Sequence, residues 1–398
     1  MVKIAFHDNC LCERGTTVSL YDYAYYNKHY LGNESIIMYI GNDKRNVSEV
    51  IEKFKKEFKL YPYENWNNDA DEILKREKCD ILYMIKAGEW DGKISKYCKN
   101  SIHCVFNTQY KHGDVYATIA PWVNGNNGKY PFVPHMINLP DSDKNMRKEL
   151  NIPDDAIVYG RHGGYEQFNI PYVSKLVFEI AKDNQNIYFL FCNTKIFCNS
   201  LPNIIHIDKI IDLEKKVEFI NTCDAMLWAR PDGEVYSLSM GEFSIKNKPI
   251  ICTNIGYPGH VYKLGKQALW YNNENELRHI LLNFDKNKIK NLDWNAYNDD
   301  TMVKVMDKFN EVFIKPLLND ININTVSFKE HDLQYNVIDA LKKEIFIHNA
   351  KTNSVKNKDG DKWDNLYKPG HLHGEWLDNN KILYEKFIID GLSIDNYF

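Results

Sequence analysis

Apolar stretches of strand length alternate along the chain with segments whose apolar positions have helical spacing. The first apolar stretches cover residues 2–7, 35–40, 79–87 and 103–108, and amphipathic segments stand between them at 19–31, 47–58 and 71–78. A short apolar run is typical of a strand buried on both faces. In the segments between the runs, the spacing of apolar positions is typical of an amphipathic helix. The order predicts βαβ units around a parallel sheet.

The alternation is interrupted once and then resumes. Residues 120–155 are rich in Gly, Pro and Asn, which predicts a linker. Strands are expected beyond it at 156–164 (running into a glycine turn), 186–193, 203–207, 225–231, 249–254 and 268–272, and helices at 172–183, 215–222, around Glu242 and at 297–318. The chain is therefore expected to be an α/β protein with two Rossmann-like lobes.

Four parts are expected along the chain. Residues 1–140 form the N-terminal lobe, 141–296 the second lobe and 297–320 a long helix that packs back toward the first lobe. Residues 321–398 do not continue the alternation and predict a small α+β extension of unknown role, with a hairpin at 373–391. Ligands of doubly wound sheets bind beyond the carboxyl ends of the strands, so the loops there are expected to converge on one cleft.

Composition narrows the class of protein. Hydrophobic residues make up 44% of the 398 positions, which is enough for a core. The net charge of −4 comes from interspersed Lys and Glu, so the sequence predicts no basic surface that would attract nucleic acid or an anionic membrane. Apart from the Cys10-Leu11-Cys12 segment, the nine cysteines are scattered singles, a pattern typical of reduced thiols. Neither a secretory signal nor an apolar run of ~18 residues is evident. We expect a cytoplasmic protein without a transmembrane segment or a nucleic-acid partner.

The most informative stretch is RPDGEVYSLSMGEF at residues 230–243. A turn at 231–233 predicts that Glu234 lies on the loop beyond the strand at 225–231. Ser237 is a predicted N-cap, so the N–H groups of residues 238–240 would carry the positive end of a helix dipole. Such a helix end binds phosphate.

Glu242 follows the predicted cap by five residues, or about 7.5 Å of helix, which is the scale of the step from a diphosphate to its ribose. A carboxylate there can accept hydrogen bonds from both ribose hydroxyls, while Glu234 would reach the sugar at the other end of the diphosphate. Two glutamates at this spacing also arise by chance as a solvated helix face. The turn, the cap and the flanking strands favour the ligand site.

These residues resemble a known family. Glu234 and Glu242, separated by seven residues and flanked by Ala-Arg-Pro and Lys-Asn-Lys-Pro-Ile-Ile, are similar to the E-x7-E segment of retaining GT-B glycosyltransferases, particularly family four. Residues 133–140 stand where those enzymes carry Asn-Gly-Val before the linker, and residues 158–164 stand where they carry a strand ending in Gly-Arg. The resemblance covers roughly residues 1–318 and implies two lobes that face a central cleft.

The resemblance also implies roles for individual positions. Glu242 would hold the donor ribose, Glu234 would contact the donor sugar at the reacting carbon, and Arg161 would pair with the diphosphate. His112, from the first lobe, would contact the donor sugar and completes the catalytic set. Further donor-binding positions are Ser237, Leu238, Ser239, Gly163, Gly164 and Lys195, and the acceptor-binding positions are Gly15, Thr16 and Thr17.

Two departures from the family pattern affect the donor site. The family usually has Gly where Ser237 stands, and it has a Lys shortly after Gly-Arg, where residues 162–168 supply none. Lys195 and Lys246 are both candidates for the missing cation, and the sequence does not choose between them. Donor type is therefore left open.

Simpler interpretations stand beside several of these residues. Arg161 fits a surface ion pair equally well, and His112 fits a structural role better than a catalytic one. Thr16 and Thr17 fit helix caps. His371, His373 and Glu375 suggest a metal, but a convincing further ligand is missing, and we expect a metal-independent protein.

The combined pattern predicts an enzyme that moves a hexosyl or pentosyl group from a nucleoside diphosphate sugar, such as a UDP- or GDP-sugar, to a hydroxyl of a glycan or similar acceptor with retention. Positive charge and N–H donors at the departing diphosphate suffice for that chemistry, so no cofactor is expected. Two alternatives are a nucleotide-sugar epimerase with the same fold and a non-catalytic carbohydrate-binding or assembly protein.

Overall fold

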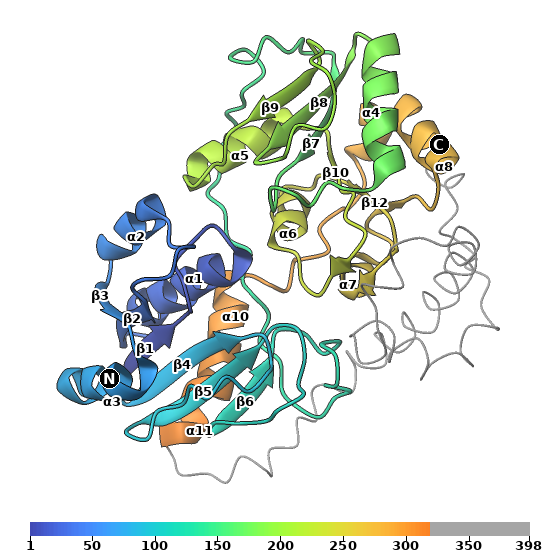
Figure 1. The fold of residues 1–398 in the computed structure, drawn as a ribbon. Helices are drawn as coiled ribbons and strands as arrows, with labels where there is room; N and C mark the ends of the chain where they lie inside the picture. Colours follow the sequence, from blue (N-terminus) through green and yellow to red (C-terminus); the bar gives the residue numbers. More distant parts are fainter. Residues whose placement is uncertain (319–398) are drawn as a thin grey trace. The chain divides into compact units, whose positions relative to one another are not determined.

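The computed structural model describes residues 1–318, which form two compact units. Within the described residues, the first unit contains Met1–Met136 and residues 299–318, and the second contains Ile137–Asn298. Each unit has a six-stranded parallel sheet with helices against it (Figure 1). The predicted α/β architecture is therefore confirmed. The extension expected at 321–398, with its hairpin and with His371, His373 and Glu375, lies outside the described residues.

The sheet of the first unit has the strand order β3-β2-β1-β4-β5-β6. Its strands are β1 (Lys3–His7), β2 (Glu34–Ile40), β3 (Lys59–Tyr63), β4 (Ile81–Lys86), β5 (Lys99–Cys104) and β6 (Val115–Thr118), and its first helices are α1 (Gly15–His29), α2 (Ser48–Lys55) and α3 (Trp66–Glu77). One face of the sheet packs against Ala70, Ile73 and Leu74 of α3. On the other face Phe6 lies with its ring centroid 5.3 Å from that of Tyr83.

The chain returns to the first unit through a continuous helical segment. It consists of α10 (Met302–Phe309), a π-helical turn (Asn310–Ile314) and α11 (Lys315–Leu318). Phe309 stacks on Tyr23 of α1 at 5.1 Å, and the hydroxyl of Ser101 donates to the carbonyl oxygen of Phe313 at 3.1 Å. The segment begins five residues later than the expected 297, because Thr301 is the N-cap.

The sheet of the second unit has the order β14-β12-β10-β7-β8-β9. Its elements are β7 (Ile157–Arg161), α4 (Pro171–Asp183), β8 (Ile187–Cys192), β9 (Ile204–Ile207), α5 (Leu213–Thr222), β10 (Ala225–Leu227), β11 (Gly233–Glu234), α6 (Leu238–Ile245), β12 (Ile250–Cys252), β13 (Tyr257–Pro258), α7 (Gly259–Leu264), β14 (Leu269–Trp270), α8 (Glu274–Leu282) and α9 (Lys286–Ile289). Tyr159 faces α4 and α8, whereas its neighbour Val158 faces α5 and α6.

Some local predictions were wrong or incomplete. Strands β3 and β6 were not predicted, and both are edge strands. Strand β3 contains Pro62, which has no N–H to donate; an edge strand tolerates this because one of its sides has no neighbouring strand. Helix α1 begins at Gly15 rather than at residue 19, and β5 ends at Cys104, so the strand expected at 103–108 is displaced. None of the helices described within residues 1–318 has the length and apolarity needed to cross a membrane.

Gly160 permits close packing behind the loop that follows β7. A Cβ atom at this position would lie 2.1 Å from Sγ of Cys223 and 3.3 Å from the ring of Phe243. Both neighbours are fully buried, on the face of the sheet that α5 and α6 cover. The absence of a side chain at residue 160 therefore brings α6 close to the strand that carries Arg161.

We expect Gly160→Ala to lower the free energy of unfolding by about 1–3 kcal/mol, because the added methyl overpacks this interface. Urea unfolding measures the change. Gly160→Ala combined with Cys223→Ala serves as the control, since removal of Sγ takes away the shortest contact, and the pair should be non-additive. Strict additivity of the two substitutions would contradict the explanation.

Candidate functional site

Helix α6 begins at the predicted cap. Ser237 has extended backbone angles, and its Oγ accepts a hydrogen bond from the N–H of Met240 at 3.4 Å. The cap prediction is confirmed, with one correction: the N–H of Met240 is used by the cap, so Leu238 and Ser239 carry the first-turn N–H groups that lack a partner within the helix. The hydroxyls of Ser237 and Ser239 lie 3.1 Å apart.

Glu234 is held by a tight crossing of two loops. Strand β11 pairs in parallel with β13, and a Cβ on Gly233, whose φ is +72°, would lie 2.2 Å from the backbone of Tyr257. The predicted turn before Glu234 therefore requires glycine at residue 233. Oε1 of Glu234 lies 3.2 Å from a guanidinium nitrogen of Arg230.

The electrostatic surroundings of Glu234 raise its pKa. Burial is the main cause, and Arg230, a hydrogen bond with Trp228 and the charge of Arg161 act in the opposite direction. The mutual influence of Glu234 and Arg161 indicates that the two predicted site residues face the same region of the second unit. A half-buried carboxyl group with a raised pKa and a contact to the guanidinium of Arg230 is typical of a ligand site rather than of a solvated helix face.

Glu242 is buried, whereas Glu234 is half-buried, and the two environments differ. Nζ of Lys216 lies 2.7 Å from Oε1 and Nε2 of His162 lies 3.0 Å from Oε2. Burial alone would raise the pKa of Glu242, but Lys216 and His162 outweigh it and lower this pKa to about 2. The two glutamates of the segment therefore differ: Glu242 is a fixed carboxylate, whereas the pKa of Glu234 is displaced upward.

Arg161 is buried at the end of β7, so the surface ion pair considered from the sequence is wrong. Its guanidinium donates to Oγ1 of Thr194 at 2.6 Å, to the carbonyl oxygen of Gly164 at 2.7 Å and to that of Asn193 at 3.3 Å. Burial lowers the pKa of Arg161 to about 10. Three of the five N–H groups are used in these bonds, which leaves two for a ligand.

The glycines beside Arg161 shape the same loop. Gly163 has a φ of +154°, and a Cβ there would lie 3.1 Å from the guanidinium of Arg161. A Cβ on Gly164 would lie 2.5 Å from the side chain of Gln167. Position 163 favours glycine because of its positive φ, whereas the close contact at Gly164 is with the end of the flexible Gln167 side chain. The carbonyl oxygen of Gly163 accepts a hydrogen bond from Nδ2 of Asn193 at 2.8 Å, which joins this loop to the one after β8.

The two lysines considered from the sequence are engaged elsewhere. Lys195 is exposed and lies 3.1 Å from Glu166, on a loop bonded to that of Arg161. Lys246 ends helix α6 and donates to the carbonyl oxygen of Pro140 at 2.8 Å, so it lies at the helix end opposite to the cap. The lysine that reaches the predicted site is Lys216 of α5, which sequence reasoning missed because the contact depends on tertiary packing. His162 was missed as well, although its position directly after Arg161 was a usable signal.

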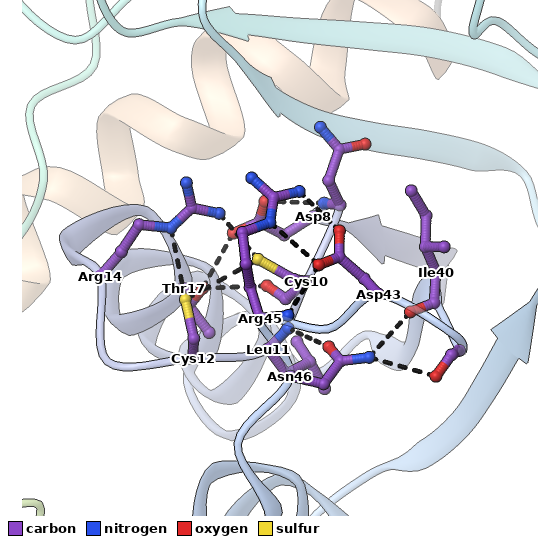
Figure 2. A network of polar contacts seen from close by, with 12 residues as sticks. Asp8, Cys10, Leu11, Cys12, Arg14, Thr17, Ile40, Asp43, Arg45 and Asn46 are labelled. Atoms are coloured by element: carbon purple, nitrogen blue, oxygen red, sulfur yellow. Dashed lines mark hydrogen bonds and ion pairs between the residues drawn. The ribbon is translucent and has the colours of Figure 1, made fainter.

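In the first unit, the predicted acceptor positions begin helix α1. Arg14 is the N-cap and makes no side-chain cap bond, so Thr16 and Thr17 are not the cap that the simpler interpretation expected. The hydroxyl of Thr17 is buried and donates to Oδ2 of Asp8 at 2.9 Å (Figure 2). Gly15 is exposed and Thr16 is half-buried, so these two positions remain open to a ligand, and their acceptor role stays a prediction.

The loop before α1 is tied together by polar contacts. The guanidinium of Arg14 donates to Sγ of Cys10 at 2.7 Å and to Sγ of Cys12 at 3.3 Å (Figure 2). The N–H of Leu11 donates to Oδ1 of Asn46 at 2.9 Å, which joins this loop to the one after β2. The loop therefore has a defined shape without a ligand.

His112 lies in the first unit and is half-buried. Its Nδ1 lies 2.6 Å from the carbonyl oxygen of Tyr110 and its Nε2 lies 3.1 Å from Nζ of Lys86, which pairs with Asp91 at 2.6 Å. Burial lowers the pKa of His112, which favours a neutral ring that donates to Tyr110 and accepts from Lys86. Both ring nitrogens thus have protein partners, and the role of His112 at a donor sugar stays a prediction.

Comparison with known proteins identifies the architecture. No family model matches the sequence, and no curated protein matches it. Among solved structures, a glycosyltransferase from Rickettsia africae is similar with a TM-score of 0.57 at 14% identity, over 80% of this chain and 99% of that one. Alr3699/HepE of Anabaena in complex with UDP-glucose is similar with a TM-score of 0.58 at 10% identity, over 78% and 99%. The chain has the GT-B fold.

A GT-B protein of another kind is also similar. A putative UDP-N-acetylglucosamine 2-epimerase from Listeria monocytogenes gives a TM-score of 0.51 at 13% identity, over 76% of this chain and 93% of that one. The GT-B fold expected from the resemblance is thus confirmed. At these identities the comparisons establish the fold and leave the reaction to be argued from the site.

The contribution of the ionised Glu242 carboxylate to the stability of the fold depends on pH. The folded pKa of about 2 lies below the ordinary value of about 4.3, so the ionised carboxylate stabilises the fold above about pH 5 and this contribution is lost as pH falls toward 2. We expect Glu242→Gln to cost about 3–5 kcal/mol at pH 7, because Lys216 is left as an unpaired buried charge, and to cost less at pH 3.

Urea unfolding between pH 3 and pH 7 measures this cost. If both proteins carry His162→Asn, the titration of His162 does not enter the comparison; Lys216, the largest cause that lowers the pKa of Glu242, stays in place, and a smaller pH dependence should remain. A cost that stays constant across that range would show that Glu242 has an ordinary pKa, and it would contradict the described effect of Lys216 and His162 on the pKa of Glu242.

Proposed function

We propose that the protein is a glycosyltransferase that transfers a sugar from a nucleoside diphosphate sugar to a hydroxyl group of a glycan or similar acceptor, with retention of the anomeric configuration. One observation carries the proposal: in a GT-B unit, the capped start of α6 stands in the sequence between the half-buried Glu234 and the buried Glu242, and each acid contacts at least one cationic side chain. The similarity to an Anabaena protein bound to UDP-glucose supports a nucleotide-sugar donor.

The site contains groups suited to the departing diphosphate. The first-turn N–H groups of Leu238 and Ser239, together with the two remaining N–H groups of Arg161, would bind its oxygens and stabilise the charge that develops on them. These donors are in place before the reaction, so no metal is required in this proposal. The acceptor hydroxyl would then attack the anomeric carbon on the face that the diphosphate leaves.

Glu234 and Glu242 have separate tasks in this proposal. Glu242, a permanent carboxylate, would accept hydrogen bonds from the ribose hydroxyls of the donor. Glu234 would bind hydroxyls of the transferred sugar. Arg230, at 3.2 Å, would hold the Glu234 side chain in place.

A nucleotide-sugar epimerase is the second candidate, and the similarity to the Listeria protein favours it over other reactions. Both candidates bind a nucleoside diphosphate sugar, so a thermal-shift screen with UDP, GDP and their sugars tests their common requirement. Incubation of the bound nucleotide sugar without an acceptor separates them. An epimerised sugar in the product would replace the transferase proposal.

We expect Glu234→Gln to lower transfer at least 100-fold, because a neutral amide does not replace the carboxylate at the reacting sugar, while the thermal shift with the nucleoside diphosphate is retained. The anomeric configuration of the wild-type product is read by NMR. Glu166→Gln is the matched control, since Glu166 is an exposed acid on a neighbouring loop, paired only with exposed Lys195 in the ion pairs of the described chain. Full transfer by Glu234→Gln would remove Glu234 from the proposed mechanism.

A further inference from the structure

Glu242 and its two partners come from three separate elements of the second unit. Glu242 belongs to α6, Lys216 belongs to the first turn of α5, and His162 follows β7 directly. Each carboxylate oxygen meets a different partner, Oε1 with Nζ of Lys216 at 2.7 Å and Oε2 with Nε2 of His162 at 3.0 Å. A carboxylate gripped at both oxygens has a fixed plane as well as a fixed position.

The ring of His162 is itself held in orientation. It stacks on Phe243 with centroids 5.7 Å apart and an interplanar angle of 21°, and its edge meets Phe219 at 5.9 Å. Burial lowers the pKa of His162, while Glu242 acts in the opposite direction. Nε2 of His162 lies 3.0 Å from Oε2 but outside hydrogen-bond geometry, so a neutral ring confines the carboxylate on that side without adding a second full charge, and Lys216 alone balances the charge of Glu242.

The arrangement leaves acceptor capacity for a ligand. A carboxylate offers about four lone-pair sites on its two oxygens; the hydrogen bond from Lys216 uses one on Oε1, and the ring of His162 lies against Oε2. The remaining sites, one on each oxygen, suit two hydroxyl donors on neighbouring carbons. A buried ion pair contributes little to stability compared with apolar residues of similar size, so the energetic gain of this pair lies in orientation.

We propose that Lys216 and His162 are positioning residues that hold the Glu242 carboxylate in the plane needed to bind both hydroxyls of a nucleotide ribose, and that they thereby determine the preference for ribonucleotides over 2′-deoxyribonucleotides. The inference rests on the proposed function, since it assumes that Glu242 receives the donor ribose. Removal of Lys216 leaves only the contact with His162, so the carboxylate can turn away from the second hydroxyl.

The test compares affinities for UDP and 2′-deoxy-UDP, and for GDP and 2′-deoxy-GDP, by isothermal titration calorimetry on the full chain. We expect the wild-type protein to prefer the ribonucleotide at least 10-fold. Lys216→Met should reduce this preference to about 3-fold or less, mainly by weakening the ribonucleotide, while the affinity for the 2′-deoxy form changes little. Lys216→Arg should restore part of the preference, because it returns a cation to the same oxygen.

Lys215→Met is the matched control, because Lys215 is the neighbouring residue on α5, is 56% exposed and pairs with Glu218. It should keep the wild-type preference. His162→Asn provides a second test in case Lys216→Met fails to fold, and it should also reduce the preference. A purely structural role would weaken both forms of the nucleotide equally, and an unchanged ratio in both variants would overturn the inference.

The outcomes separate the inference from the proposed function. If the wild-type protein binds neither UDP nor GDP, the proposed function and the inference both fail. If it binds one of them without a preference for ribose, or if the preference survives in Lys216→Met and in His162→Asn, the inference fails and the proposed function stands.

Discussion

A carboxylate buried in the second unit must have its charge balanced, and much of the local structure follows from that requirement. Glu242 sits on a helix whose face packs against the sheet, where an isolated charge would be strongly disfavoured. Lys216 and His162 meet this requirement from two other elements. The packing of α5 and α6 against β7 is therefore linked to electrostatics, and Gly160 allows the helices to approach closely enough for the contacts to form.

In the second unit, the pKa values of Glu234 and Glu242 are shifted in opposite directions. Glu234 lies on a two-residue strand formed where the loops after β10 and β12 cross, and burial raises its pKa more than Arg230 and Arg161 lower it. Glu242 has the lower pKa because a lysine contacts it directly. Acids whose environments displace their pKa values in opposite directions are suited to different tasks at one ligand. This difference argues against the view that the pair is a solvated helix face.

The first unit is organised around a different kind of interaction. Its core is aromatic, with Phe309 of the returning helix stacked on Tyr23 of α1, so the C-terminal part of the described chain completes the core of the N-terminal part. The loop between β1 and α1 is held by polar contacts of Asp8, Thr17 and Arg14, and its residues Cys10 and Leu11 are fully buried. A loop that is fixed by its own side chains offers a preformed surface, which reduces the entropy lost when a ligand binds.

The sequence by itself determined the parallel α/β architecture, the cap at Ser237 and the turn that needs Gly233, because strand periodicity, capping and turn chemistry are local properties. It was wrong about the start of α1 and missed β3, since an edge strand with Pro62 lacks the apolar run of a central strand. Only the tertiary structure decided that Lys216 reaches Glu242 and that Lys195 and Lys246 contact Glu166 and Pro140. It also decided that Arg161 is buried and that His112 has partners at both ring nitrogens. Those facts depend on distances between segments far apart in the chain, which packing sets and which no spacing of residues along the sequence encodes.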